Sequence, residues 1–238
     1  MSGWKAKRFW TGAEALRGAE GWEVRLDGRP LQTPGKVPLI LPTRPLAEAV
    51  AAEWHSVEGI VDPARMPLTR AANAALDKVA PRRAEVAAML AAYGETDLLC
   101  HRAEGPAGLA ARQAEAWDPL LAWAAEALEA PLDVTTGLLP VPQPAASLER
   151  LRGRIDALDP FQLTAFHDLV TLTGSLLLGF AAISGKGTAD SLWKASRIDE
   201  DWQAETWGAD PEAVLAAAAK RADFMQALRF LALLAPAG

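Results

Sequence analysis

Cysteine and histidine are scarce in this chain of 238 residues, which contains one cysteine and three histidines. The single cysteine, Cys100, excludes an intramolecular disulfide framework and fits a reducing compartment. The histidines His55, His101 and His167 lie in unrelated segments and lack the close spacing of zinc ligands. We therefore expect neither a disulfide scaffold nor a metal site.

Long apolar runs and clusters of basic residues are also missing. The longest apolar run, Leu169 to Ile183, is shorter than the roughly 20 residues that a helix needs to cross a bilayer. The first ten residues lack the apolar segment of a secretory signal. The formal net charge is -6, whereas nucleic acids and anionic membranes attract clustered lysine and arginine. We expect no nucleic-acid binding and no membrane insertion.

The first forty or so residues are rich in strand signals. Segments Lys7–Thr11 and Trp22–Leu26 have strand composition, and the second alternates apolar with charged residues. Asp27-Gly28 is a hairpin turn signal, so Arg29–Thr33 would be the return strand. Val37–Leu41 supplies a further short strand. These segments predict a small antiparallel β module.

The pattern becomes helical after Thr43, a candidate N-cap. Leu46, Val50 and Trp54 then form one apolar stripe, and this spacing predicts that Trp54 is structural. The change of pattern places a domain boundary between a small β-rich domain, residues 1–43, and an α-helical domain, residues 44–238. The predicted fold class is α+β, with a small N-terminal antiparallel β domain followed by a larger multi-helical domain.

Three later helices are indicated by periodicity. Leu109–Leu128 is the clearest amphipathic one, with Trp117 on its apolar face as a structural residue. A long central helix is expected from Asp159 through Leu177. Residues Pro211–Leu234, which begin with acidic residues and are rich in alanine, are predicted to form the last helix.

Trp193 to Asp210 combines three tryptophans with an unbroken acidic triplet. On a helix that ends at Gly208, aromatic rings and carboxylates would share one edge. Such a mixture suits contact with another protein, because aromatic side chains supply buried area and carboxylates supply orientation. The alternative is that the tryptophans lie in the core and the acidic triplet faces solvent. The candidate partner-binding residues are Asp199, Glu200, Asp201, Trp202, Gln203 and Trp207.

Signals of catalysis are weak. Gly185-Lys186 is followed by glycine instead of serine or threonine and follows helix-like sequence, unlike a phosphate-binding loop. The side chains of neighbours Cys100 and His101 diverge in any regular backbone, so they do not form a nucleophile and base pair. Asp97 could be a buried structural cap or a binding carboxylate.

Several phrases resemble a known family, the chaperones that assemble the F1 part of ATP synthase in mitochondria and alphaproteobacteria by holding the free α subunit. The matching phrases are KRFW, VRLDGRPLQTP, LPTRPLAEAVAAEW, MPLTRAANAALD, ETDLLCHR, QAEAWDPLLAW and RIDEDWQAETWG. They occur in the family's order across nearly the whole chain. His101 and Ala209 depart from the family's usual tyrosine and glutamate.

The resemblance implies a chaperone without catalysis or cofactor, which binds the α subunit until the β subunit displaces it. It points to Glu200, with Asp199 and Asp201, as functionally important. It also implies a cytoplasmic protein in bacteria, or a matrix protein in mitochondria, that is monomeric when free. Two alternatives stay open: an enzyme with its site between the β module and the helices, and a structural subunit of a complex.

Overall fold

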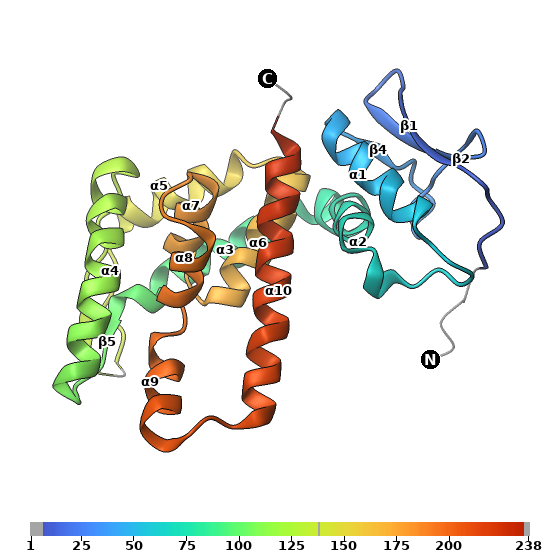
Figure 1. Ribbon diagram of the computed structural model, residues 1–238. Helices are drawn as coiled ribbons and strands as arrows, with labels where there is room; N and C mark the ends of the chain where they lie inside the picture. Colours follow the sequence, from blue (N-terminus) through green and yellow to red (C-terminus); the bar gives the residue numbers. More distant parts are fainter. Residues whose placement is uncertain (1–6, 138, 236–238) are drawn as a thin grey trace. The chain divides into compact units, whose positions relative to one another are not determined.

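The computed structural model describes residues 7–137 and 139–235, and the chain folds into two compact units (Figure 1). Unit 1 comprises Met1–Arg83, Asp159–Ala165 and Arg229–Gly238, and unit 2 comprises Ala84–Leu158 and Phe166–Leu228. The small antiparallel sheet comes first and the larger helical part follows, so the predicted fold class is confirmed.

Unit 1 contains a four-stranded antiparallel sheet and the helices after it. Its elements are β1 (Ala13–Arg17), β2 (Trp22–Leu26), β3 (Arg29–Pro30), β4 (Ile40–Leu41), α1 (Arg44–His55), η1 (Pro63–Arg65), α2 (Pro67–Ala74), the π-helical η2 (Ala75–Val79) and η3 (Ala80–Arg82). Strand β2 pairs with each of the other three strands. The turn at Asp27-Gly28 joins β2 to β3 as predicted, with both residues at positive φ.

The predicted strand at Lys7–Thr11 is wrong. Lys7 makes only an isolated bridge with Ile60, and the first strand begins at Ala13. The reason is a competing side chain, because the carboxylate of Asp27 accepts hydrogen bonds from the Thr11 and Gly12 N–H groups. These bonds lower the pKa of Asp27, the one from Gly12 most strongly.

The core of unit 1 lies between the sheet and α1, and it draws on all three chain segments. Thr43 caps α1 by accepting a hydrogen bond from Leu46 N–H. Val24 of the sheet packs in one cluster with Leu46 of α1 and with two residues from distant segments, Phe161 and Phe230. The predicted division at residues 43 and 44 follows the change from strand to helix, and residues 1–43 as a domain of their own remain a prediction.

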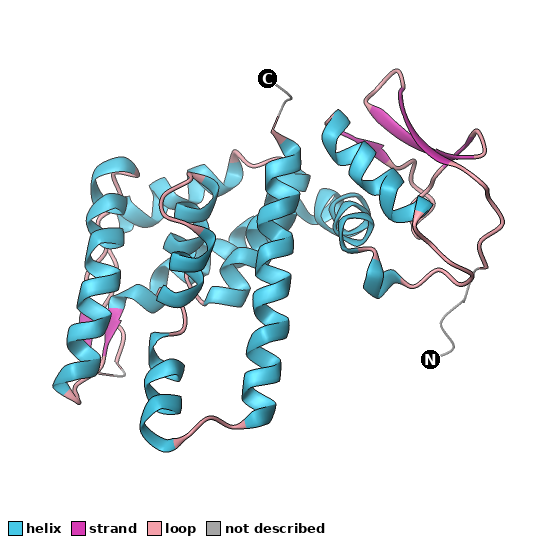
Figure 2. Cartoon of the chain, viewed as in Figure 1, coloured by secondary structure: helices cyan, strands magenta, loops and turns pink. Residues whose placement is uncertain are grey.

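Unit 2 is almost entirely helical (Figure 2), and its described residues include the short parallel strand pair of β5 and β6. Its elements, several of which begin or end in unit 1, are α3 (Arg83–Ala91), η4 (Ala92–Thr96), η5 (Leu98–Cys100), β5 (His101–Arg102), α4 (Ala107–Ala127), β6 (Thr135–Thr136), α5 (Ala145–Asp156), α6 (Pro160–Thr173), α7 (Leu176–Ile183), α8 (Ala189–Ala195), α9 (Ile198–Trp207) and α10 (Pro211–Leu234). Among the described residues, no helix is both long and apolar enough to cross a membrane.

The long helix expected from Asp159 through Leu177 is instead two helices, α6 and α7. Gly174 has a φ of 70°, which ends α6, and Ser175 caps α7 by accepting a 3.0 Å hydrogen bond from Leu178 N–H. Asp97 fixes this break, because its carboxylate accepts hydrogen bonds from Ser175 Oγ and Leu177 N–H. A partner 78 positions away thus interrupts an apolar run that looks continuous.

Candidate functional site

The predicted partner-binding stretch forms α9, a short helix between α8 and α10. Three acidic residues fill its first turn, where the positive end of the helix dipole favours them. The helix ends at Gly208, whose φ of 91° is a conformation that glycine adopts without strain. The predicted end at Gly208 is confirmed, but the stretch from Trp193 is not one helix, because α8 ends at Ala195 and α9 begins at Ile198. Helix α9 packs against α4.

Arg112 of α4 joins the two helices at the surface. Its Nη1 and Nη2 each donate a 2.9 Å hydrogen bond to the carboxylate of Glu205, and its guanidinium lies 5.0 Å from the Trp202 ring centre. A Cβ at Gly108 would lie 2.8 Å from that indole, so only glycine permits this approach. Trp202 is therefore held between Gly108 and Arg112.

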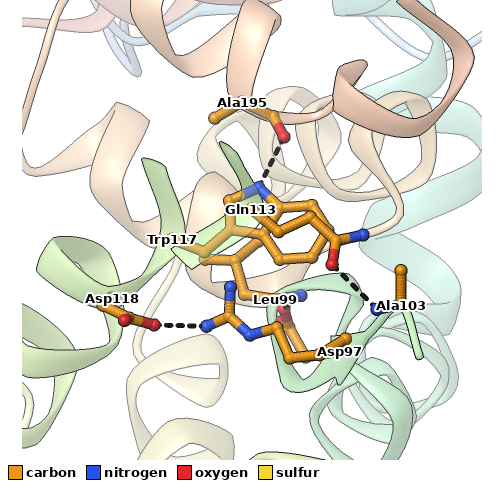
Figure 3. A network of polar contacts seen from close by, with 8 residues as sticks. Asp97, Leu99, Ala103, Gln113, Trp117, Asp118 and Ala195 are labelled. Atoms are coloured by element: carbon orange, nitrogen blue, oxygen red, sulfur yellow. Dashed lines mark hydrogen bonds and ion pairs between the residues drawn. The ribbon is translucent and has the colours of Figure 1, made fainter. Parts of the chain in front are cut away.

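A second attachment is buried. Gln113, only 1% exposed, donates a 2.6 Å hydrogen bond to Asp199 of α9 and accepts one from Ala103 N–H. One turn further along α4, Trp117 Nε1 donates to Ala195 O at the end of α8 (Figure 3). These buried hydrogen bonds fix the position of the α8–α9 segment on α4.

The six candidate residues of α9 divide into two groups. Asp199 and Trp202 are half-buried and contact α4, as described above. The other four are exposed: Glu200, Asp201, Gln203 and Trp207. Trp207 is 77% exposed, which is unusual for so large an apolar side chain. Glu200 accepts a 2.6 Å hydrogen bond from Arg197 and stays in water.

The comparisons with known proteins place the chain among chaperones. The family of the ATP12 chaperone protein matches residues 7–125. Atp12 from Paracoccus denitrificans is 53% identical, with a TM-score of 0.95 over 97% of this chain and 99% of that one. The chain belongs to the ATP12 chaperone family. The predicted resemblance is confirmed.

Other ATP12 relatives are more distant in sequence. The Atu1473 protein of Agrobacterium tumefaciens is 36% identical, with a TM-score of 0.91 over 97% of this chain and 87% of that one. The mitochondrial protein atp12 of Schizosaccharomyces pombe is 25% identical over 217 residues, covering 85% of this chain and 74% of the relative. Relatives of this ATP12 chain thus occur in bacteria and in a mitochondrion.

Asp97 of this ATP12 chain is completely buried in unit 2. Its carboxylate accepts hydrogen bonds from Leu99 N–H at 3.0 Å, Ser175 Oγ at 2.7 Å and Leu177 N–H at 3.0 Å. Burial raises its pKa, against the opposing effect of these hydrogen bonds. The neighbouring Cys100 is buried too, and burial raises its pKa to about 12, so it remains a thiol. Both positions suit a structural role.

Sequence reasoning missed the α4 side of the site. Arg112 and Glu205 were not singled out, because 93 positions separate them and neither belongs to a spaced motif. One signal was available: Gln113 lies on the apolar face of the amphipathic α4. A polar residue on a core face needs a partner, and that partner is Asp199. Among the described residues, no group of three or more His, Cys, Asp or Glu could hold a metal ion.

Proposed function

We propose that this ATP12 family member binds the unassembled α subunit of F1 ATP synthase and shields its interface until the β subunit displaces it. The family and its relatives are named as chaperones, which supports a non-enzymatic role. An unassembled subunit exposes an apolar interface that would otherwise aggregate. Displacement by β is a competition between two partners for one surface, so release requires no nucleotide.

The observation that carries the proposal is an exposed tryptophan beside exposed carboxylates on a helix that is fixed in place. Trp207 supplies apolar area, and Glu200 and Asp201 supply charge that orients a basic group of the partner. Because Arg112 and Gln113 fasten α9 to α4, little ordering entropy is lost when a partner docks.

The six α9 residues then have two kinds of role. Glu200, Asp201, Gln203 and Trp207 contact the client, whereas Asp199 and Trp202 hold the helix in the orientation that presents them. Structural roles are proposed for Trp54, Trp117 and Asp97. The protein works without a cofactor, as a monomer when free, in the cytoplasm of a bacterium or in a mitochondrial matrix.

Copurification tests the proposal. Tagged protein is isolated from cells that make the α subunit but lack β, and α is expected to come with it in amounts near one to one. Adding purified β should release α and leave the chaperone free. Wild-type protein that retains no α in the absence of β would sink the proposal. Copurification only with assembled F1 would favour a structural subunit instead.

A further inference from the structure

The first half of α10 has almost no protein around it. From Pro211 to Asp223 every residue except Ala217 is exposed, and the first buried residue is Phe224, which packs against Trp193. Isolated helices shorter than about 12 to 15 residues are marginal in water even when rich in alanine. The exposed half therefore depends on the buried half for its helical form.

Two large apolar residues lie on this exposed half. Val214 is 52% and Leu215 is 72% exposed, and both fall within the first two turns of α10. At 3.6 residues per turn, Leu215 lies on the side of α10 opposite Phe224 and Ala227, and Val214 lies on the flank between these two sides. Closer packing of α10 through its core side would leave Leu215 uncovered.

Trp207 lies next to these residues along the chain. Helix α9 ends at Trp207, and only Gly208 to Asp210 separate it from α10, as the loop at the lower edge of Figure 1 shows. Exposed apolar side chains therefore stand on both sides of one short connection. Large exposed apolar side chains that gather in one part of a protein surface are a feature of interaction sites.

The charge around this surface selects the partner. From Asp199 to Ala219 there are six acidic residues and no lysine or arginine; Lys220 and Arg221 follow, and Arg221 forms an ion pair with Asp190. Two of the six, Glu200 and Glu205, form ion pairs with arginines, and the other four are Asp199, Asp201, Asp210 and Glu212. A second copy of this chain would bring like charge against like, and anionic lipid would be repelled. The surface suits an apolar face bordered by basic residues.

We propose that the first half of α10, residues 211–219, together with Trp207, docks an apolar face of the free α subunit that is bordered by lysine or arginine. This inference rests on the proposed function and adds a second helix to the contact surface. Docking covers Val214 and Leu215 and fixes the helix that carries them.

The test combines hydrogen exchange with a double substitution. In wild-type protein, amides 212–220 are expected to exchange at least tenfold more slowly when α subunit made without β is bound. Val214→Ala with Leu215→Ala should weaken α capture at least tenfold, because it removes apolar area but keeps strong helix formers. Met89→Ala, which truncates another exposed apolar residue of unit 2, should stay within twofold of wild type.

The outcomes separate the two proposals. If wild-type protein and the double variant capture α equally, or if the α10 amides gain no protection, this surface is wrong and the chaperone function stands. Self-association of the free protein that the double variant abolishes would assign the surface to a second copy and overturn the inference. If wild-type protein captures no α, the proposed function fails and this inference falls with it.

Discussion

Arg112 donates hydrogen bonds to both carboxylate oxygens of Glu205, which lies 93 positions later in the chain, and this pair fastens α9 to α4. Its side chains are 40% and 59% exposed, so water and salt screen it and its contribution to global stability is small. The local effect is larger. Helix α9 has one buried residue, Ile198, and depends on a few contacts for its position.

Arg112→Lys should therefore loosen α9 without unfolding the protein. Lysine keeps the charge but cannot pair with both oxygens in a planar fork, and it stacks less well on Trp202. We expect the urea denaturation midpoint to change little, because water and salt screen an exposed pair, while amide exchange in residues 199–207 accelerates severalfold. Arg152→Lys, at an exposed i,i+4 pair on α5, serves as the control. Unchanged exchange in α9 would contradict the assigned role.

The pKa of Glu205 should lie below the ordinary value for a glutamate. The hydrogen bond from Arg112 lowers its pKa, so its stabilising effect is fully present above the unfolded-state value of about 4.3 and is lost as pH falls through the lower folded-state pKa. A carboxyl ¹³C NMR titration should show Glu205 ionising below other exposed glutamates. In Arg112→Ala the titration midpoint of Glu205 should return to the ordinary range. A midpoint that stays low would show that Arg112 does not lower the pKa of Glu205.

Asp97→Ala should be among the most damaging substitutions in unit 2. It leaves Leu99 N–H, Ser175 Oγ–H and Leu177 N–H without their acceptor in the buried interior of unit 2. The expected loss is on the order of 3 kcal/mol, from unsatisfied donors and a lost cap at α7. Urea denaturation measures it. Asp223 is exposed, and Asp223→Ala serves as the control, with an expected change in stability of less than about 0.5 kcal/mol. Equal urea midpoints for the two variants would refute the structural role of Asp97.

Elements with local signals could be predicted from the sequence, and elements defined by distant partners could not. Strand β2 and helix α10 have their predicted bounds, because alternation, proline and alanine content are local properties. The break at Gly174 depends on Asp97, so a single segment did not reveal it. In the candidate site, the composition of the sequence indicated α9. It did not indicate which residues of α9 face α4, because that depends on contacts with Arg112 and Gln113 of a distant helix.

Trp54 offers a test with an internal control. Its ring lies 5.2 Å from that of Trp10 and its carbonyl accepts a hydrogen bond from Trp10 Nε1, while its own buried Nε1 has no partner among the described residues. Trp54→Ala should cost about 3 kcal/mol, the low end for such truncations because the ring is half-buried. Trp54→Phe keeps an aromatic ring and removes the unpaired donor, so it should cost less than about 1.5 kcal/mol. The melting temperature of each variant measures these losses. If Trp54→Ala melts within a few degrees of wild type, Trp54 is dispensable for the fold.

Glu200→Lys separates client binding from folding. Its ion pair with Arg197 is exposed on the glutamate side, so the loss of stability should stay below about 1 kcal/mol, and circular dichroism should show an intact fold. Capture of α should fall at least tenfold, because attraction for a basic client group becomes repulsion. Glu126→Lys, which reverses the charge of an exposed residue on α4, is the control. Normal capture by a folded Glu200→Lys protein would remove this residue from the contact surface.

The core of unit 1 has a consequence for synthesis. Phe230, which is 1% exposed, packs in the same cluster as Val24 and Leu46, and stacks on Phe161 with ring centres 6.4 Å apart. On a ribosome the sheet and α1 emerge more than 170 residues before Phe230, as the residue numbers give. The nascent N-terminal segment therefore keeps an open apolar side until residues translated much later complete its core. Ribosome-bound chains that end before Phe230 should be digested by protease in their first 83 residues, and chains extended beyond it should resist.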